Sequence, residues 1–190
     1  TTAHETSTTT GDLDRARELT EAGVPVFIAP PNPDYDPTVT DRDDPRPREF
    51  LLPGKWQETP ADPRTLDGWK PGYAVCLVTG HGLDAADIDP KNGAEVVAQG
   101  HRLEAVGVER LGTVVTPSGG AHFYTRSTGI GSASRTAVGV DFRGRGLDGS
   151  GAGFLYLPGT SRPKYDGTGY VWAQAIAAAD KLGLDSSASL

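Results

Sequence analysis

Glycine and proline divide this chain into short segments, which limits it to folds built from short strands and helices. The 190 residues include 25 glycines and 15 prolines. Apolar or alternating runs typical of strands occur at residues 24–29, 73–79, 83–89, 112–116, 121–125, 138–143 and 154–157. Helical patterns occur at residues 12–22, 62–68, 93–106 and 173–182. Because helices and hairpins are interspersed without a regular βαβ repeat, the pattern predicts an α+β fold.

The length favours a single domain, since domains commonly have roughly 100–200 residues. We expect this domain to span residues 12–183, with a disordered polar tail at 1–11 and a second tail at 184–190 that leads to further domains of a longer protein. Residues 30–53 are dense in proline and aspartate, which predicts an irregular surface loop. Loops of this length often serve as binding loops.

Composition excludes several classes of protein. Cys76 is the one cysteine and lies in an apolar run, which excludes an internal disulfide and a multi-cysteine zinc site and favours a reducing, cytoplasmic setting. The sequence has no apolar run of about 18 residues, so we expect no membrane partner. The net charge is −7, yet residues 110–164 carry seven basic and only two acidic side chains. That segment is suited to a polyphosphate partner, although such segments are often plain solvated surface.

Asp87 and Asp89 form the sharpest local motif, Asp-x-Asp on the strand-like run 83–89. Residues two apart on a strand project from the same face, so the two carboxylates should lie together. Paired carboxylates repel unless they share a proton or bind a cation, and hard oxygen ligands favour Mg²⁺ or Mn²⁺. The alternative is turn chemistry that leads into Pro90.

A glycine-containing turn follows at residues 116–120, and His122 lies on the strand after it. Backbone N–H groups in such a turn can approach an anion, which makes Ser118, Gly119, Gly120 and His122 candidates for binding phosphate. An ordinary hairpin turn with a hydrogen-bonded histidine is the competing interpretation.

Asp141 and Arg143 alternate with apolar residues and should therefore share one strand face. A third carboxylate beside a cation would complete a metal site, with the arginine on the departing phosphates. An internal Asp–Arg pair is the alternative.

Residues 144–149 match the spelling of the dinucleotide-binding G-x-G-x-x-G motif. That motif requires a helix to begin in the loop, whereas more glycines and the strand-like run 154–157 follow here. We therefore reject a dinucleotide-binding fold, and the sequence also lacks a P-loop motif.

Taken in order, these three motifs resemble those of the bifunctional primase-polymerase family of phage and plasmid replication proteins, within the archaeo-eukaryotic primase superfamily. The resemblance extends over roughly residues 12–172 and includes the Pro53-Gly54-Lys55-Trp56 segment. It implies an RRM-like mixed sheet with packed helices and a small α/β subdomain. It also implies a helicase domain in the same full-length chain.

The resemblance assigns roles to individual residues. Asp87, Asp89 and Asp141 would be the catalytic ligands of two Mg²⁺ or Mn²⁺ ions, without zinc. Ser118, Gly119, Gly120, His122 and Arg143 would bind the incoming nucleotide, and Lys55 is a weaker candidate. The implied reaction is nucleotidyl transfer from dNTPs or NTPs to a primer on a single-stranded DNA template.

Two other functions remain open on the sequence alone. A glycosyltransferase can also use Asp-x-Asp with a cation, but it leaves the 116–122 turn and Asp141 without roles. A replication-initiation module could bind single-stranded DNA without catalysis, through the basic segment and the aromatic residues Tyr124, Phe142 and Tyr156.

Overall fold

The structure is a computed structural model that describes the backbone of residues 2–38 and 48–176 and the side chains of residues 11–38 and 48–176. Its elements, in chain order, are α1 (Thr2–Glu21), β1 (Val26–Ala29), the 3-10 helices η1 (Trp56–Glu58) and η2 (Pro63–Leu66), β2 (Ala74–Val78), β3 (Leu83–Ile88), η3 (Pro90–Asn92), α2 (Val96–Ala105), β4 (Gly112–Val115), β5 (Ala121–Arg126), β6 (Ala133–Ala137), β7 (Val140–Arg143), β8 (Phe154–Tyr156), η4 (Pro163–Tyr165) and β9 (Val171–Gln174).

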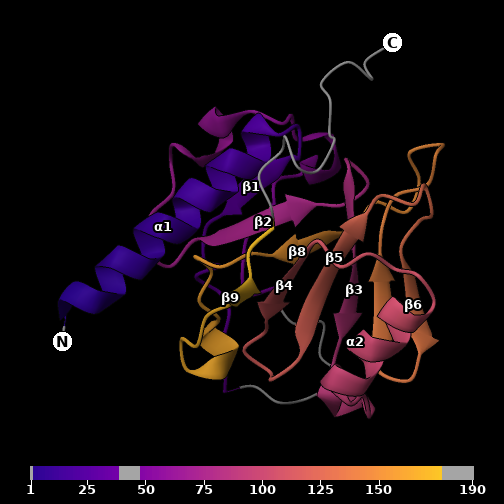
Figure 1. Ribbon diagram of the computed structural model, residues 1–190. Helices are drawn as coiled ribbons and strands as arrows, with labels where there is room; N and C mark the ends of the chain where they lie inside the picture. The colour runs from indigo at the N-terminus through magenta and orange to yellow at the C-terminus, as the bar shows by residue number, and fades with distance from the viewer. Residues whose placement is uncertain (1, 39–47, 177–190) are drawn as a thin grey trace.

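The described strands form two antiparallel sheets. The smaller sheet has the order β1-β2-β8, and the larger has the order β6-β7-β3-β5-β4-β9. Figure 1 shows α1 beside the smaller sheet and α2 against the larger one. The chain is therefore an α+β protein, as the sequence predicted. Every strand pair is antiparallel, which corrects the expectation of a mixed sheet.

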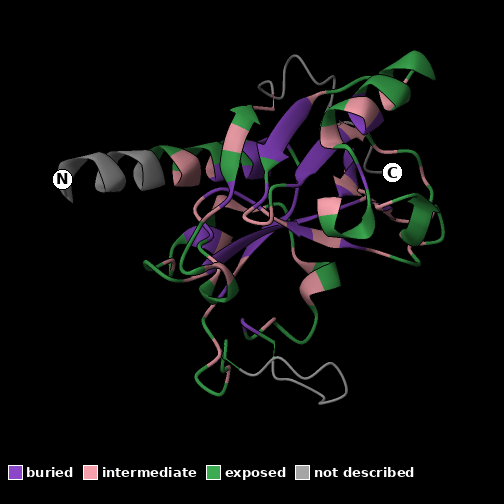
Figure 2. Ribbon diagram, turned by 90° about the horizontal axis from the view of Figure 1, so that it is seen from below, coloured by how far each residue is buried: buried purple, intermediate pink, exposed green. Residues whose placement is uncertain are grey.

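The largest part of the core lies between the two sheets. Val26, Val75 and Leu77 of the smaller sheet pack in one cluster with Leu83 and Tyr124 of the larger sheet, and this cluster also contains Ala16 and Leu19 of α1. Figure 2 shows the buried residues concentrated on the central strands. Because side chains alternate along a strand, the opposite face of β3 and β5 packs separately against α2 through Ala86, Ile88 and Phe123.

Several predicted elements agree with the structure within a few residues. The strands β1, β2, β3, β4, β5 and β8 and the helix α2 all fall inside the ranges predicted for them or within one residue of those ranges. Asp62 caps the short helix η2 by accepting a hydrogen bond from the backbone N–H of Arg64 at 2.9 Å. No helix begins between β7 and β8, in agreement with the rejection of a dinucleotide-binding motif.

Other elements differ from the predictions. The run 138–143 is not one strand, because Gly139 adopts a positive φ of 66° in the turn of a hairpin between β6 and β7. Residues 173 and 174 belong to β9 rather than to the start of a helix, and most of the predicted helix 173–182 lies outside the described residues. The helix α1 begins at Thr2, ten residues before the start of the predicted helical pattern at residue 12, so residues 2–11 are helical.

Within the described residues, no helix is long and apolar enough to cross a membrane.

Candidate active site

Three neighbouring strands bring Asp87, His122 and Asp141 side by side. In the central strand β3, Asp87 is paired in register with His122 of β5 on one side and with Asp141 of β7 on the other. Along β3, Leu83 and Ala85 point into the core between the sheets. Asp87 shares their face but lies where the core gives way to a cleft, and it lines that cleft.

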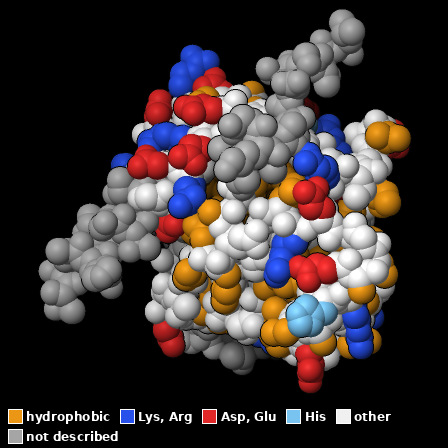
Figure 3. Space-filling view, viewed as in Figure 1, with side chains coloured by type: hydrophobic (Ala, Val, Ile, Leu, Met, Phe, Trp, Pro, Cys, Tyr) orange, Lys and Arg blue, Asp and Glu red, His pale blue; other side chains and the backbone are white. Residues whose placement is uncertain are grey.

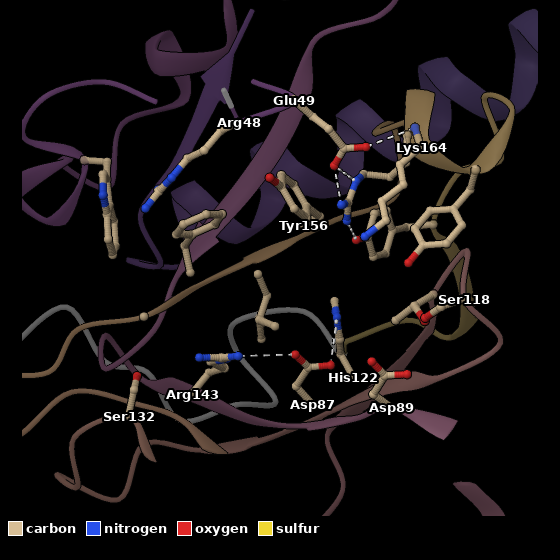
Figure 4. Close-up of a pocket in the computed structure, with 18 of the residues that line it drawn as sticks. Arg48, Glu49, Asp87, Asp89, Ser118, His122, Ser132, Arg143, Tyr156 and Lys164 are labelled. Carbon is tan, nitrogen blue, oxygen red and sulfur yellow. Dashed lines mark hydrogen bonds and ion pairs between the residues drawn. The ribbon is translucent and has the colours of Figure 1, made fainter. Parts of the chain in front are cut away.

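The cleft has a volume of about 800 Å³. One wall, the strand wall, carries Asp87, Asp89, Ser118, His122 and Arg143. The facing wall, the loop wall, carries Arg48, Glu49, Trp56, Arg162 and Lys164. Figure 4 shows the labelled residues of the two walls facing each other across the cleft, with Tyr156 between them.

Asp87 lies in an environment that disfavours its negative charge. Burial raises the pKa of its carboxyl group, and the neighbouring Asp141 and Asp89 carboxylates raise it further, while Arg143 lowers it. The Arg143 guanidinium lies 3.7 Å from Asp87 and 2.8 Å from Asp141. Arg143 thus shares its one positive charge between Asp87 and Asp141. This single charge does not balance the negative charges of the three carboxylates at the site.

His122 is neutral in this structure. Burial lowers its pKa to about 3, and the positive charges of Arg143 and Arg162 act in the same direction. Its side chain is only 5% exposed, and its Nε2 atom lies 3.7 Å from the Asp87 carboxylate, beyond hydrogen-bond distance. A neutral imidazole can donate one hydrogen bond to a ligand, but it supplies no positive charge.

Asp141 takes part in the Asp–Arg pair that the sequence left open. One of its oxygens accepts a hydrogen bond from the backbone N–H of Arg135, and the other accepts one from Arg143, each at 2.8 Å. Asp141 adjoins Asp87 but does not line the cleft itself.

Asp89 both takes part in the turn that leads into Pro90 and presents its carboxylate to the cleft, so it fits both interpretations of the Asp-x-Asp motif. It follows the last residue of β3 in extended conformation and accepts a hydrogen bond from the backbone N–H of Lys91, which caps η3. It also lines the cleft together with Asp87, as the same-face prediction requires.

The turn after β4 places Ser118 in the cleft but not its glycines. The hydroxyl groups of Ser118 and Thr116 are 2.9 Å apart, and Thr116 also accepts a hydrogen bond from the backbone N–H of Gly120. A Cβ atom on Gly120 would lie 2.2 Å from the carbonyl oxygen of Ile88, so this glycine is required for close packing. Gly119 adopts a positive φ of 80° in the turn.

Three further candidates are separated from the cleft. Lys55 is exposed and pairs with Glu58 at 3.3 Å. Tyr124 is fully buried in the core, and Phe142 lines a small apolar cavity beside α2 on the other face of the sheet. Of the proposed stacking residues, only Tyr156 reaches the cleft.

Most residues of the loop wall were absent from the sequence-based candidates. Glu49 and Arg162 form a buried ion pair, and Arg162 also donates a hydrogen bond to the Tyr170 hydroxyl at 2.8 Å. Burial opposes the charge of Arg162, but the Glu49 carboxylate outweighs it and raises the pKa of the guanidinium. The basic excess in residues 110–164 was a signal for Arg162 and Lys164. The predicted loop at residues 30–53 contains Arg48 and Glu49, but no pattern singled out these two residues within it.

The donor atoms fit a divalent cation in part. Asp87 and Asp89 present carboxylate oxygens to one cleft, and burial, followed by the charges of Asp141 and Asp89, raises the pKa of Asp87, so a cation would stabilise its ionised form. Among residues 11–38 and 48–176, no three His, Cys, Asp or Glu side chains lie close enough together to hold one metal ion. Both oxygens of the Asp141 carboxylate accept hydrogen bonds, one from Arg135 and one from Arg143.

Comparison with known proteins gave no match, either to a protein-family model or to a curated protein.

Proposed function

We propose that this chain is a primase-polymerase domain that catalyses template-directed, divalent-metal-dependent nucleotidyl transfer in phage or plasmid replication. The observation that carries the proposal is the in-register alignment of Asp87, His122 and Asp141 on three adjacent strands beside a cleft. The three motifs of the resemblance lie far apart in sequence, yet this alignment brings them together.

Each residue of the strand wall has a role in this reaction. Asp87 and Asp89, with Asp141 after release from Arg143, would hold Mg²⁺ or Mn²⁺. When bound, the metal would acidify the attacking hydroxyl group and neutralise charge on the triphosphate. Ser118 and neutral His122 would donate hydrogen bonds to phosphate oxygens. Arg143 carries the positive charge of this wall and would bind phosphate directly.

Nucleotide incorporation tests the proposal. Labelled dNTPs and NTPs are supplied with Mg²⁺ or Mn²⁺ on single-stranded and on primed DNA templates. We expect products from the wild type and none from an Asp87→Ala, Asp89→Ala double variant. Asp67→Ala is the matched control, because Asp67 is exposed and lies outside the cleft. Absence of product from the wild type, or equal product from the double variant, would contradict the proposal.

A second function is favoured by one observation, the engagement of Asp141 with Arg143 and Arg135. If that arrangement persists with ligands, the site lacks its third carboxylate, and the chain would bind single-stranded DNA without catalysis. Unchanged DNA affinity in the double variant, together with no incorporation by the wild type, would identify this alternative.

A further inference from the structure

The Pro53-Gly54-Lys55-Trp56 segment has no role in the proposed reaction, but its last residue, Trp56, lies at the cleft. Lys55 is directed to its surface partner Glu58, but Trp56 and Gln57 line the cleft. The Trp56 ring packs edge-on against Phe154 with ring centroids 5.1 Å apart, and it is tilted against Phe27 at 6.1 Å. Aromatic neighbours therefore hold the indole in place at the cleft.

Arg145 lies directly beside this segment. Its guanidinium is 2.6 Å from Nε2 of His81 and 3.5 Å from the backbone oxygen of Gln57. A Cβ atom on Gly80 would lie 2.1 Å from the Cβ atom of Arg145, so the glycine allows Arg145 to approach the end of β2 this closely. The position of Arg145 next to Gln57 is thus fixed by packing, and Arg145 adjoins the cleft through this cleft-lining residue without lining it itself.

Arg48, which lines the cleft, is a second candidate guanidinium. Figure 4 shows Arg48 and Arg143 toward one end, and Ser118 and Lys164 toward the other. Arg143 and Arg162 are paired with carboxylates. Arg48 and Arg145, by contrast, form no ion pair with any carboxylate in the part of the chain that the structure describes.

We propose that Trp56, Arg48 and Arg145 form a platform that binds single-stranded nucleic acid at this end of the cleft. Unpaired bases stack on aromatic side chains, and guanidinium groups neutralise the phosphates between them. A base pair hides its ring faces in the stack, so an aromatic residue inside a cleft selects for single strands. This proposal rests on the proposed function, in which the platform would hold the single-stranded template.

The face of the molecule seen in Figure 3 shows no second site of this kind. Acidic and basic side chains are interspersed there, without a continuous basic area. Because the net charge of the chain is −7, non-specific attraction to the phosphate backbone is weak. Affinity must then come from a local arrangement of cations and an aromatic ring.

Fluorescence anisotropy with a labelled 20-nucleotide DNA strand tests the platform, in EDTA and without nucleotides, at several salt concentrations. We expect Trp56→Ala to weaken binding roughly 5- to 150-fold and Trp56→Phe to weaken it less, because phenylalanine retains a stacking face. Arg48→Gln and Arg145→Gln should each reduce the salt slope by about 0.7, the value for one lost contact to a single-stranded phosphate.

Lys70→Ala is the control, since Lys70 is an exposed cation outside the cleft. Circular dichroism and melting temperatures identify any variant that misfolds, and the Phe and Gln substitutions retain much of the original packing. Wild-type affinity in Trp56→Ala, Arg48→Gln and Arg145→Gln, or an equal loss in Lys70→Ala, would overturn the platform. Tighter binding of a duplex of the same length would overturn it as well.

Incorporation assays on the same variants separate this proposal from the proposed function. A wild type that binds single strands through these residues but incorporates no nucleotide contradicts the polymerase and leaves the platform in place. Full incorporation and binding by the platform variants, with an active wild type, contradicts only the platform.

Discussion

His122 shows how burial of one residue links the site to pH. In the unfolded chain its pKa is 6.5, and in the folded protein it is about 3. Between these values the unfolded state takes up a proton that the folded state excludes. The free energy of unfolding therefore falls as the pH decreases from 6.5 toward 3, by about 1.4 kcal/mol per pH unit.

Replacement of His122 by glutamine should remove this dependence. Between pH 7 and pH 5 the wild type should lose about 2 kcal/mol more free energy of unfolding than His122→Gln loses. Urea denaturation at the two pH values measures the difference. Equal losses in the two proteins would show that His122 is protonated, or accessible to solvent, in the folded state.

Asp87→Asn should stabilise the protein in the absence of divalent cations. Because the pKa of Asp87 is raised by burial and by two nearby carboxylates, its ionised form opposes folding. This cost develops as the pH rises from the unfolded value of 3.8 through the folded pKa. Asparagine removes the charge, and Arg143 retains Asp141 at 2.8 Å.

Thermal unfolding at pH 7 in EDTA measures this effect, with Asp67→Asn as the control. Addition of Mn²⁺ should raise the melting temperature of the wild type and leave that of Asp87→Asn unchanged. A lower melting temperature of Asp87→Asn in EDTA would show that Asp87 stabilises the folded chain through its pair with Arg143.

At the scale of elements, the sequence was informative where a strand is largely buried. In β3 and β5 one face meets the core between the sheets and the other packs against α2, so these strands carry apolar residues and were predicted. All five residues of β6 are exposed, so its sequence carries no apolar period. The alanine-rich sequence after Tyr170 resembles a helix, but pairing with β4 makes residues 171–174 a strand.

The packing of α2 against the larger sheet depends on Gly100. A Cβ atom at this position would lie 2.5 Å from the ring of Phe123, so overpacking in Gly100→Ala should cost about 1–3 kcal/mol. The gain of about 1 kcal/mol that alanine normally gives in a helix offsets part of this cost, and we expect a net destabilisation of up to about 2 kcal/mol. Urea denaturation checks the prediction.

Gly11→Ala in α1 is the matched control. Nothing lies within 4 Å of a Cβ atom at Gly11, so only the helix propensity acts, and we expect stabilisation by up to about 1 kcal/mol. The two glycine-to-alanine changes should therefore have opposite signs. Stabilisation by both changes would mean that Phe123 moves aside without cost.

At the scale of the whole molecule, Glu49 and Arg162 join segments 113 residues apart. Their side chains are 7% and 17% exposed, so removal of one partner leaves a buried charge. Glu49→Gln should lower the free energy of unfolding by about 3–5 kcal/mol, whereas Glu58→Gln, in the exposed pair with Lys55, should cost less than about 1 kcal/mol. Chemical denaturation of both variants, each at the same pH, measures the contrast.

The two walls of the cleft differ in how far the sequence predicted them. Asp87, His122 and Arg143 were predicted because each lies on a strand whose alternation fixes the direction of its side chain. Arg48, Glu49 and Trp56 lie in segments of irregular backbone or in a single 3-10 turn, where sequence spacing says nothing about direction. Their position depends on contacts between distant segments, such as the hydrogen bond from the Lys164 backbone to Glu49.

This division between the walls has a consequence for how the site can change over evolution. The strand wall is held by the hydrogen-bond ladders of β3 with β5 and β7, so substitutions elsewhere leave its spacing intact. The loop wall, outside its buried Glu49–Arg162 pair, lies in irregular backbone and 3-10 turns, where insertion and replacement disturb no ladder. A new ligand specificity can therefore arise in the loops while the arrangement of carboxylates is inherited unchanged.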